Sequence, residues 1–382
     1  MARLMSTVVG FCVVAAATIS PVHAAPARYS ATDIGNLGGS YVQAYAMNSR
    51  GQVTGIASLA GDAQFHAFLS TAGFMTDIAA LGGVSSSGVA INDRGQVVGT
   101  LSDHAFLYTN GSLVDLGTLP GGTSSGATGI NAVGQVTGTA TYAGGVSTHA
   151  FFYSNGAMMD LGTLGGSFSA GNFINRVGQI VGSSMTTGDH EIHAFLYSRG
   201  AMKDLGTLPG STYSEPRALN DRGHVAGVWI STSDFGAQHC FLYTKGPLLD
   251  LGNVPGGTAC TPAAINSEDQ VAGTVVIAGY LPHAFLYDGK KLKDLGTLGG
   301  SYSIGRAINS DGLAVGSSSI NGDLSQHAFL YSAAGGMRDL NSMVDHSGAL
   351  SGVTINSASV ITDEGLILVQ GDNLHSYVLR PR

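Results

Sequence analysis

Short apolar stretches separated by glycine-rich turns repeat along the chain from about residue 25 to its end. In one such unit, four strands are predicted at residues 88–91, 96–99, 104–108 and 113–116. Asn92 to Gly95 is typical of a tight turn, and Asn110-Gly111 is typical of a two-residue hairpin. Consecutive tight hairpins require antiparallel pairing. A parallel β-helix, the main alternative for this repeat length, would run its strands in one direction.

Three sequence markers recur once in each unit. An Asp-aliphatic pair followed by Gly recurs roughly every 44 residues, and its last copy ends in Asn in place of Gly. The copies begin at Asp33, Asp77, Asp115, Asp160, Asp204, Asp250, Asp294 and Asp339. A His opens a His-Ala-Phe motif or a variant of it at His66, His104, His149, His193, His239, His283, His327 and His375. An Asn follows an aliphatic residue at Asn48, Asn92, Asn131, Asn175, Asn220, Asn266, Asn309 and Asn356. Eight copies of each marker predict eight units, and this period is typical of propellers and solenoids.

The two ends of the repeat region are complementary. The last unit stops at Arg382 without an Asp-Leu strand, whereas a surplus strand surrounds Asp33 near the beginning. Pairing them would close a ring and remove exposed sheet edges. The sequence therefore predicts an all-β, eight-bladed β-propeller of four-stranded antiparallel blades, with the last blade closed by the N-terminal strand. Residues 25–382 are expected to form this single domain of eight repeats of about 44 residues.

The first 24 residues are typical of a signal peptide. Arg3 precedes an apolar run over residues 4–19, and the small residues that end at Ala24 permit cleavage there. The run is shorter than the ~20 apolar residues that a membrane span requires. A secreted or periplasmic protein without a membrane span is predicted.

Composition narrows the possible functions. The 382 residues include 57 Gly, only 11% are charged, and 17 Lys+Arg stand against 25 Asp+Glu. Such a chain lacks the general basic surface of a nucleic-acid binder, and its glycine content disfavours long helices. A hydrophobic content of 44% excludes general disorder. A monomer is expected.

The His-Ala-Phe, Asp-Leu-Gly and Ile-Asn…Gly-Gln-Val-Val-Gly signatures resemble the HAF repeat family of probable extracellular bacterial proteins. The resemblance covers nearly all of the chain after residue 25. It implies export and a repeat architecture, and it implies no particular activity or catalytic residue.

The repeated His residues are predicted to form structural pairs with Asp rather than a metal site. In the hairpin around Asn110-Gly111, His104 becomes the diagonal neighbour of Asp115 on the same sheet face. The same spacing predicts the pairs His66–Asp77, His104–Asp115, His149–Asp160, His193–Asp204, His239–Asp250, His283–Asp294, His327–Asp339 and His375–Asp33. A motif present in every blade is distributed around a ring, so its members cannot converge on one ion. No metal and no cofactor are predicted.

Recognition or catalysis requires residues that differ between blades. Alignment of the first strands on their Asn identifies Gln43, Tyr45, Asn172, Glu215, Arg217 and Arg306 as varied positions near the channel mouth, and Trp229 lies close to a variable loop. The three charged residues are either a ligand site or mutually paired, solvated charges. The indole of Trp229 either stacks on a sugar or fills the core.

Cys240 and Cys260 are the only cysteines after the predicted signal peptide. An even number in an oxidising compartment is compatible with a disulfide, here between the fifth and sixth blades, although two free thiols are an equal alternative.

Two classes of function follow from these residues. The leading prediction is a secreted, non-enzymatic binding scaffold that recognises an extracellular glycan, polymer or protein at the channel mouth. The alternative is a hydrolase or lyase that acts on an extracellular polymer at the central channel, with Glu215 as acid/base and Arg217 or Arg306 holding an anionic group. A purely architectural role is a third possibility, and the fold alone does not discriminate among them.

Overall fold

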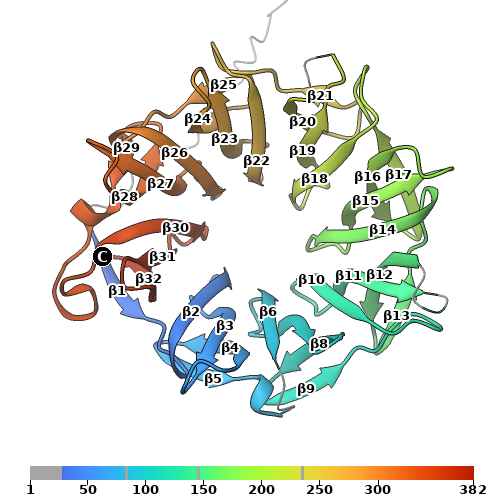
Figure 1. Cartoon of the computed structure of the whole chain (residues 1–382), viewed down its shortest axis with the longest axis horizontal. Helices are drawn as coiled ribbons and strands as arrows, with labels where there is room; N and C mark the ends of the chain where they lie inside the picture. The colour runs from blue at the N-terminus through green and yellow to red at the C-terminus, as the bar shows by residue number, and fades with distance from the viewer. Residues whose placement is uncertain (1–27, 82–84, 143, 145–146, 234–235) are drawn as a thin grey trace, which may run out of the picture.

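A computed structural model of the chain describes residues 28–81, 85–142, 144, 147–233 and 236–382. The predicted signal peptide, residues 1–24, lies outside them. The described strands form eight four-stranded antiparallel units arranged as a ring around a central axis (Figure 1). The prediction of an eight-bladed propeller is therefore confirmed. A single parallel pair, Thr148 with Phe168, joins the third and fourth blades into one continuous sheet.

Each of the first seven blades uses four consecutive strands, with the first strand nearest the axis and the fourth at the rim (Figure 1). Blade one comprises β2 (Gly38–Met47), β3 (Val53–Leu59), β4 (Phe65–Thr71) and β5 (Phe74–Asp77), and blade two comprises β6 (Ser86–Ile91), β7 (Val97–Leu101), β8 (His104–Thr109) and β9 (Ser112–Asp115). Blade three comprises β10 (Ser125–Ile130), β11 (Val136–Tyr142), β12 (Ser147–Ser154) and β13 (Ala157–Asp160). Blade four comprises β14 (Gly165–Ile174), β15 (Ile180–Thr186), β16 (Ile192–Ser198) and β17 (Ala201–Gly206). Blade five comprises β18 (Ser214–Leu219), β19 (Val225–Ile230), β20 (Gln238–Tyr243) and β21 (Leu249–Asp250). Blade six comprises β22 (Ala259–Ile265), β23 (Val271–Ile277), β24 (Leu281–Tyr287) and β25 (Leu292–Asp294). Blade seven comprises β26 (Gly299–Ile308), β27 (Ala314–Ile320), β28 (Gln326–Ser332) and β29 (Gly336–Asp339).

Three short 3-10 turns are the helical segments of the described residues: η1 (Ala79–Leu81), η2 (Leu340–Met343) and η3 (Gly348–Leu350). Within the described part of the chain, no helix has the length and apolar character needed to cross a bilayer.

The eighth blade joins the two ends of the chain. It contains β30 (Ile355–Ile361), β31 (Ile367–Gly371) and β32 (Ser376–Pro381), and its outer strand is β1 (Tyr29–Asp33). β1 pairs with β32 in antiparallel register, from Tyr29 opposite Pro381 to Asp33 opposite Tyr377. This is the predicted closure of the ring by the N-terminal strand.

The packing of each blade explains two of the sequence markers. In seven blades the Phe of the His-Ala-Phe motif is buried directly opposite the last Gly of the Gly-Gln-Val-Val-Gly signature or its variant. The pairs are Gly55–Phe68, Gly99–Phe106, Gly138–Phe151, Gly182–Phe195, Gly227–Phe241, Gly273–Phe285 and Gly316–Phe329. A glycine leaves room for the aromatic ring to lie over the neighbouring strand.

The repeated Asn links each blade to the next. Its Oδ1 accepts the backbone N–H four residues later, which fixes the turn after the first strand. Its Nδ2 donates to the backbone carbonyl of the equivalent residue in the next blade at 2.9–3.2 Å. These seven bonds start at Asn48, Asn92, Asn131, Asn175, Asn220, Asn266 and Asn309. The Asn is therefore buried because both ends of its amide are needed.

The eighth copy of this marker was wrongly assigned to Asn356. Asn356 lies inside β30, and the turn after that strand begins at Thr362, whose carbonyl accepts the bond from Asn309. The reason is an insertion, residues 340–354, that contains η2 and η3 before the first strand begins. Correct alignment places Ser357 and Ser359 at the varied positions near the mouth.

Candidate functional site

The antiparallel strands give the ring two distinct ends. The turns that contain the repeated Asn lie at one end, which we call the Asn face. The third strands start, and the fourth strands finish, at the opposite end, which we call the His face because the His-Ala-Phe motifs begin there. The varied positions lie within the first strands, three and five residues before the turns of the Asn face.

Predicted His–Asp pairs occupy the His face. In seven blades the His Nδ1 lies 2.7–3.2 Å from a carboxylate oxygen of its predicted Asp. The joined pairs are His66–Asp77, His104–Asp115, His149–Asp160, His193–Asp204, His283–Asp294, His327–Asp339 and His375–Asp33. In the fifth blade, His239 stacks on Trp229 with ring centroids 4.6 Å apart, and Asp250 accepts the Gly252 N–H.

The same Asp also fixes the start of the connection to the next blade. In most blades its Oδ1 accepts the backbone N–H two residues later, as Asp115 does from Gly117 at 2.7 Å. The pair therefore joins the third strand, the fourth strand and the following loop. Because it recurs around the rim, it supplies a structural contact to seven of the blades. The described residues contain no group of three or more His, Cys, Asp or Glu arranged to hold a metal ion.

A cavity of about 260 Å³ lies where blades seven, eight and one meet. Its lining includes Arg306 of β26, Ser357 and Ser359 of β30, and Gln43 and Tyr45 of β2. We call it the seam cavity. Three neighbouring blades contribute different residues at one repeat position, which are Arg306 in blade seven, Ser359 in blade eight and Tyr45 in blade one. The cavity is therefore asymmetric. The small serine leaves the two larger side chains facing one space.

The cation of the seam cavity is available to a ligand. Arg306 is exposed, and within the described chain its guanidinium has neither an ion pair nor a hydrogen bond. The described lining residues include no Asp or Glu. Burial, and then the neighbouring Tyr41, raise the pKa of the Tyr45 phenol above its usual range. Tyr45 therefore carries its proton at neutral pH, and it lines the same cavity as Arg306.

Glu215 and Arg217 form a separate cluster in the fifth blade. The Arg217 guanidinium lies 3.1 Å from Glu215 Oε2, and the Tyr213 hydroxyl donates to the same oxygen at 2.5 Å. Burial, and then Glu215, raise the pKa of Tyr213 to about 12. β18, which carries these residues, lies across the ring from β2 (Figure 1). The three predicted charges are therefore divided, because Glu215 and Arg217 pair with each other and neither lines the cavity of Arg306.

The remaining predicted residues have different environments. Trp229 is 8% exposed and packs in the core cluster with Phe241 and Leu196, so its indole is a core group rather than an open stacking surface. Asn172 occupies in the fourth blade the position that Arg217 has in the fifth, and its Oδ1 is buried with no hydrogen-bond partner in the part of the chain that the structure describes.

Sequence reasoning missed Tyr41, Ser357 and Ser359. The Tyr41 hydroxyl donates to Gln43 Oε1 at 2.5 Å, just as Tyr213 donates to Glu215. Both tyrosines lie seven residues before the repeated Asn, so this position contained a usable signal. The two serines were missed because the eighth blade was aligned on Asn356.

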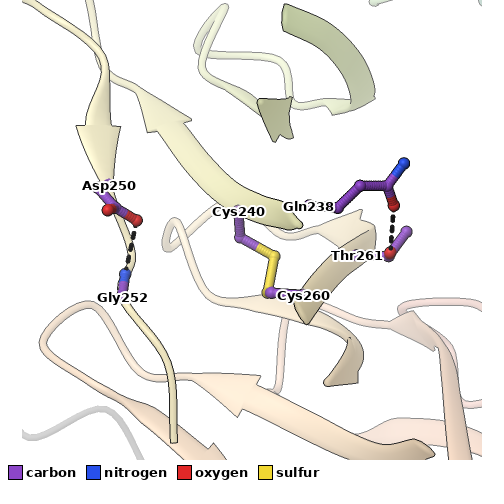
Figure 2. Close-up of a disulfide and its surroundings, with 6 residues drawn as sticks. All are labelled: Gln238, Cys240, Asp250, Gly252, Cys260 and Thr261. Carbon is purple, nitrogen blue, oxygen red and sulfur yellow. Dashed lines mark hydrogen bonds between the residues drawn. A yellow bond between two sulfur atoms is a disulfide. The ribbon is translucent and has the colours of Figure 1, made fainter. Parts of the chain in front are cut away.

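A disulfide joins blades five and six. Cys240 of β20 and Cys260 of β22 are bonded, with their Cα atoms 5.4 Å apart (Figure 2). Beside it, the Thr261 hydroxyl donates to Gln238 Oε1 at 3.3 Å, also between these blades. Both sulfur atoms belong to the buried core, so the bond is shielded as well as structural.

Replacement of both Cys240 and Cys260 by Ala is expected to lower the free energy of unfolding by about 3 kcal/mol. The bond closes a loop with a sequence separation of 20 residues, and loss of that constraint increases the entropy of the unfolded chain. Urea unfolding of the oxidised wild type and the double variant measures the difference. Reduction of the wild type should reproduce the variant, and equal midpoints before and after reduction would contradict the prediction.

Comparisons with known proteins give a fold and no family. No family model matches the chain, and no curated protein matches its sequence. Solved structures do match. A structure from a structural and mechanistic analysis of two prolyl endopeptidases has a TM-score of 0.53 and 10% identity, and the match covers 88% of this chain and 55% of that chain. The β-propeller domain of the Trilobed protease from Pyrococcus furiosus has a TM-score of 0.47 and 10% identity, covering 78% and 96%. An oligogalacturonate lyase in complex with manganese has a TM-score of 0.48 and 10% identity, covering 92% and 91%.

These neighbours correct the leading prediction about function. A non-enzymatic binding scaffold was expected, whereas the similar structure with a TM-score of 0.53 reported above comes from a study of prolyl endopeptidases, which are enzymes. This chain spans only about half of the peptidase chain, and a structural likeness at 10% identity shows the fold alone.

Proposed function

We propose that this protein is an enzyme of the hydrolase or lyase class that acts on an extracellular polymer, with the seam cavity as its reaction site. The observation that carries the proposal is the position of Arg306, an exposed guanidinium without a partner among the described residues, in the same cavity as the protonated phenol of Tyr45. Cleavage of the bond between two sugar units requires a proton on the leaving oxygen by either route, and elimination also develops negative charge next to an acidic group.

The two groups have complementary roles in this proposal. Arg306 stabilises negative charge on the polymer, and Tyr45 donates its proton to the leaving oxygen as the bond to that oxygen breaks. In hydrolysis a water molecule adds to the cleaved carbon, and the proton that the water loses restores the phenol. In elimination a carbon–carbon double bond forms, and the proton lost from the neighbouring carbon restores the phenol. Gln43 and the serines of β30 offer neutral hydrogen bonds that orient the chain. Glu215 is a less suitable acid/base than the sequence alone indicated, because Arg217 and Tyr213 already occupy its Oε2.

The place of action is part of the same proposal. We propose export after cleavage near Ala24. The disulfide between Cys240 and Cys260 supports it, since such bonds persist in oxidising compartments outside the cytosol.

Arg306→Ala is expected to lower kcat/KM by about 100-fold or more, because one preorganised charge at the reacting centre is typically worth that much. Tyr45→Phe should lower kcat by at least about 100-fold, since it removes the proton donor and keeps the ring. The assay follows cleavage of a panel of polysaccharides and proteins by the exported chain. Activity should also fall at alkaline pH as Tyr45 loses its proton, and Tyr45→Phe should lack that fall.

Arg199→Asn is the matched control. Arg199 lies in the β16–β17 turn with a positive φ that Asn tolerates, so the variant removes one arginine away from the cavity. Its activity should equal that of the wild type. No turnover of any polymer by the wild type, or full activity of Arg306→Ala, would refute the proposed function.

A further inference from the structure

We infer that the substrate is an anionic polysaccharide, whose acidic group binds Arg306 and whose sugar rings lie against the aromatic side chains of the first blade. This inference rests on the proposed function for the location of the reaction, and it names the chemical class of the polymer.

The charge of the seam cavity selects an anionic group. The protein as a whole is acidic, with a formal net charge of −8. Arg217, the other arginine at the equivalent strand position, is neutralised by Glu215 at 3.1 Å. Arg306 has no such neighbour, and the cavity that it lines contains no carboxylate among its described residues. Its planar guanidinium can donate two parallel hydrogen bonds, the geometry that a carboxylate or sulfate group accepts.

Aromatic side chains extend from this cation along the first blade. Tyr45, which lines the cavity, is 40% exposed, and Phe65 at the start of β4 is 39% exposed. Tyr41 connects them, because its ring meets Phe65 edge-on at 5.7 Å and its hydroxyl bonds Gln43 of the cavity. Large apolar side chains left in water next to a concave polar site are typical of a binding surface.

The combination of groups favours sugars over an acidic polypeptide. A sugar ring has an apolar face that can stack on an aromatic ring and hydroxyl groups around its edge. The edge matches the neutral donors and acceptors of the cavity, which come from Gln43, Ser357, Ser359 and Gln370. An acidic polypeptide would satisfy Arg306 and leave the aromatic surface without a regular partner.

Binding to a defined panel tests the inference. Affinity electrophoresis and calorimetry compare alginate, polygalacturonate, hyaluronan and dextran sulfate with neutral dextran, esterified alginate and poly-L-glutamate. The wild type should bind at least one anionic polysaccharide ten-fold or more tightly than the neutral and peptide polymers. The carboxylated and sulfated members distinguish the source of the anion.

Variants separate the two parts of the proposed site. Arg306→Ala should weaken binding of the preferred polymer at least ten-fold, and Arg199→Asn should leave it unchanged. Phe65→Ala should weaken the same binding several-fold while retaining the preference for the anionic form. Preference for poly-L-glutamate, absence of binding to every anionic polysaccharide, or equal binding by Arg306→Ala would overturn the inference.

Failure of the inferred substrate class can be told apart from failure of the proposed enzymatic function. Binding of an anionic polysaccharide through Arg306 without any turnover would refute the enzyme and support the ligand class. Turnover of a neutral polymer or a protein, without tighter binding of anionic polysaccharides, would support the proposed enzymatic function and refute the inferred class of substrate. New reducing ends without the ultraviolet absorbance of an unsaturated sugar would identify hydrolysis, and both signals together would identify a lyase.

Discussion

Tyr29→Ala is expected to lower the free energy of unfolding by about 3–5 kcal/mol, the cost of truncating a large buried aromatic side chain. Tyr29 begins β1 and is 0% exposed. It belongs to the buried core cluster that also contains Met343, Val344 and Leu350 of the insertion before blade eight and Leu379 of β32. Loss of the ring would leave a cavity at the junction of the two chain ends. Equilibrium unfolding in urea, followed by tryptophan fluorescence and circular dichroism, measures the change.

Tyr29→Phe separates packing from hydrogen bonding in this test. The Tyr29 hydroxyl is buried without a hydrogen-bond partner among the described residues, and burial raises its pKa to about 12. Removal of an unsatisfied buried hydroxyl should leave stability equal to the wild type or higher. A Tyr29→Ala variant within 1 kcal/mol of the wild type would show that β1 does not secure the ring.

The pairing of β1 with β32, where Tyr29 lies, could be predicted from the sequence. The last repeat lacks a fourth strand, and the N-terminal end has one strand too many. An incomplete last unit and a surplus strand around Asp33 are visible as sequence markers, and an unpaired strand edge is unfavourable. The packing partners of Tyr29 were not predictable in the same way. They come from η2 and η3, a segment that interrupts the repeat, so periodicity contains no information about where it folds.

The error at Asn356 has a specific physical origin. The residue at this position closes the turn after the first strand, and its backbone carbonyl accepts a hydrogen bond from the Asn of the preceding blade. A backbone carbonyl receives that bond, so any residue type can be present at the receiving end. Thr362 receives it from Asn309 at 3.2 Å, and the side-chain pattern therefore points to the wrong residue.

The sequence identified Gln43, Tyr45 and Arg306 as varied positions, but it did not predict that they line one cavity or that Ser357 and Ser359 lie between them. Glu215 and Arg217 are two positions apart on one strand, so their side chains share a face and their ion pair could be expected. Arg306 and Tyr45 are distant in sequence, and they reach one cavity only because a blade with small serines separates them. That arrangement depends on how three strands sit around the ring.

Gly182→Ala is expected to lower the free energy of unfolding by about 4 kcal/mol or more. A Cβ at this position would overlap the backbone carbonyl of Ala170 in β14 and would lie within 2.8 Å of the Phe195 ring. The carbonyl belongs to the neighbouring strand of the same sheet and the ring is fully buried, so neither can move without breaking contacts. Overpacking against a backbone atom is among the few causes of losses this large. Urea unfolding of the variant measures the loss.

Gly246→Ala is the control for the change of residue type. Gly246 lies in the turn between β20 and β21, where its backbone does not have a positive φ and where an added Cβ would meet no atom within 4 Å. The variant should be as stable as the wild type or slightly more stable, since Ala reduces the freedom of the unfolded chain. A Gly182→Ala variant that unfolds at the same urea concentration as Gly246→Ala would mean that β14 and β15 are farther apart than described. In that case the Gly–Phe pairing would not explain why the repeated motif ends in glycine.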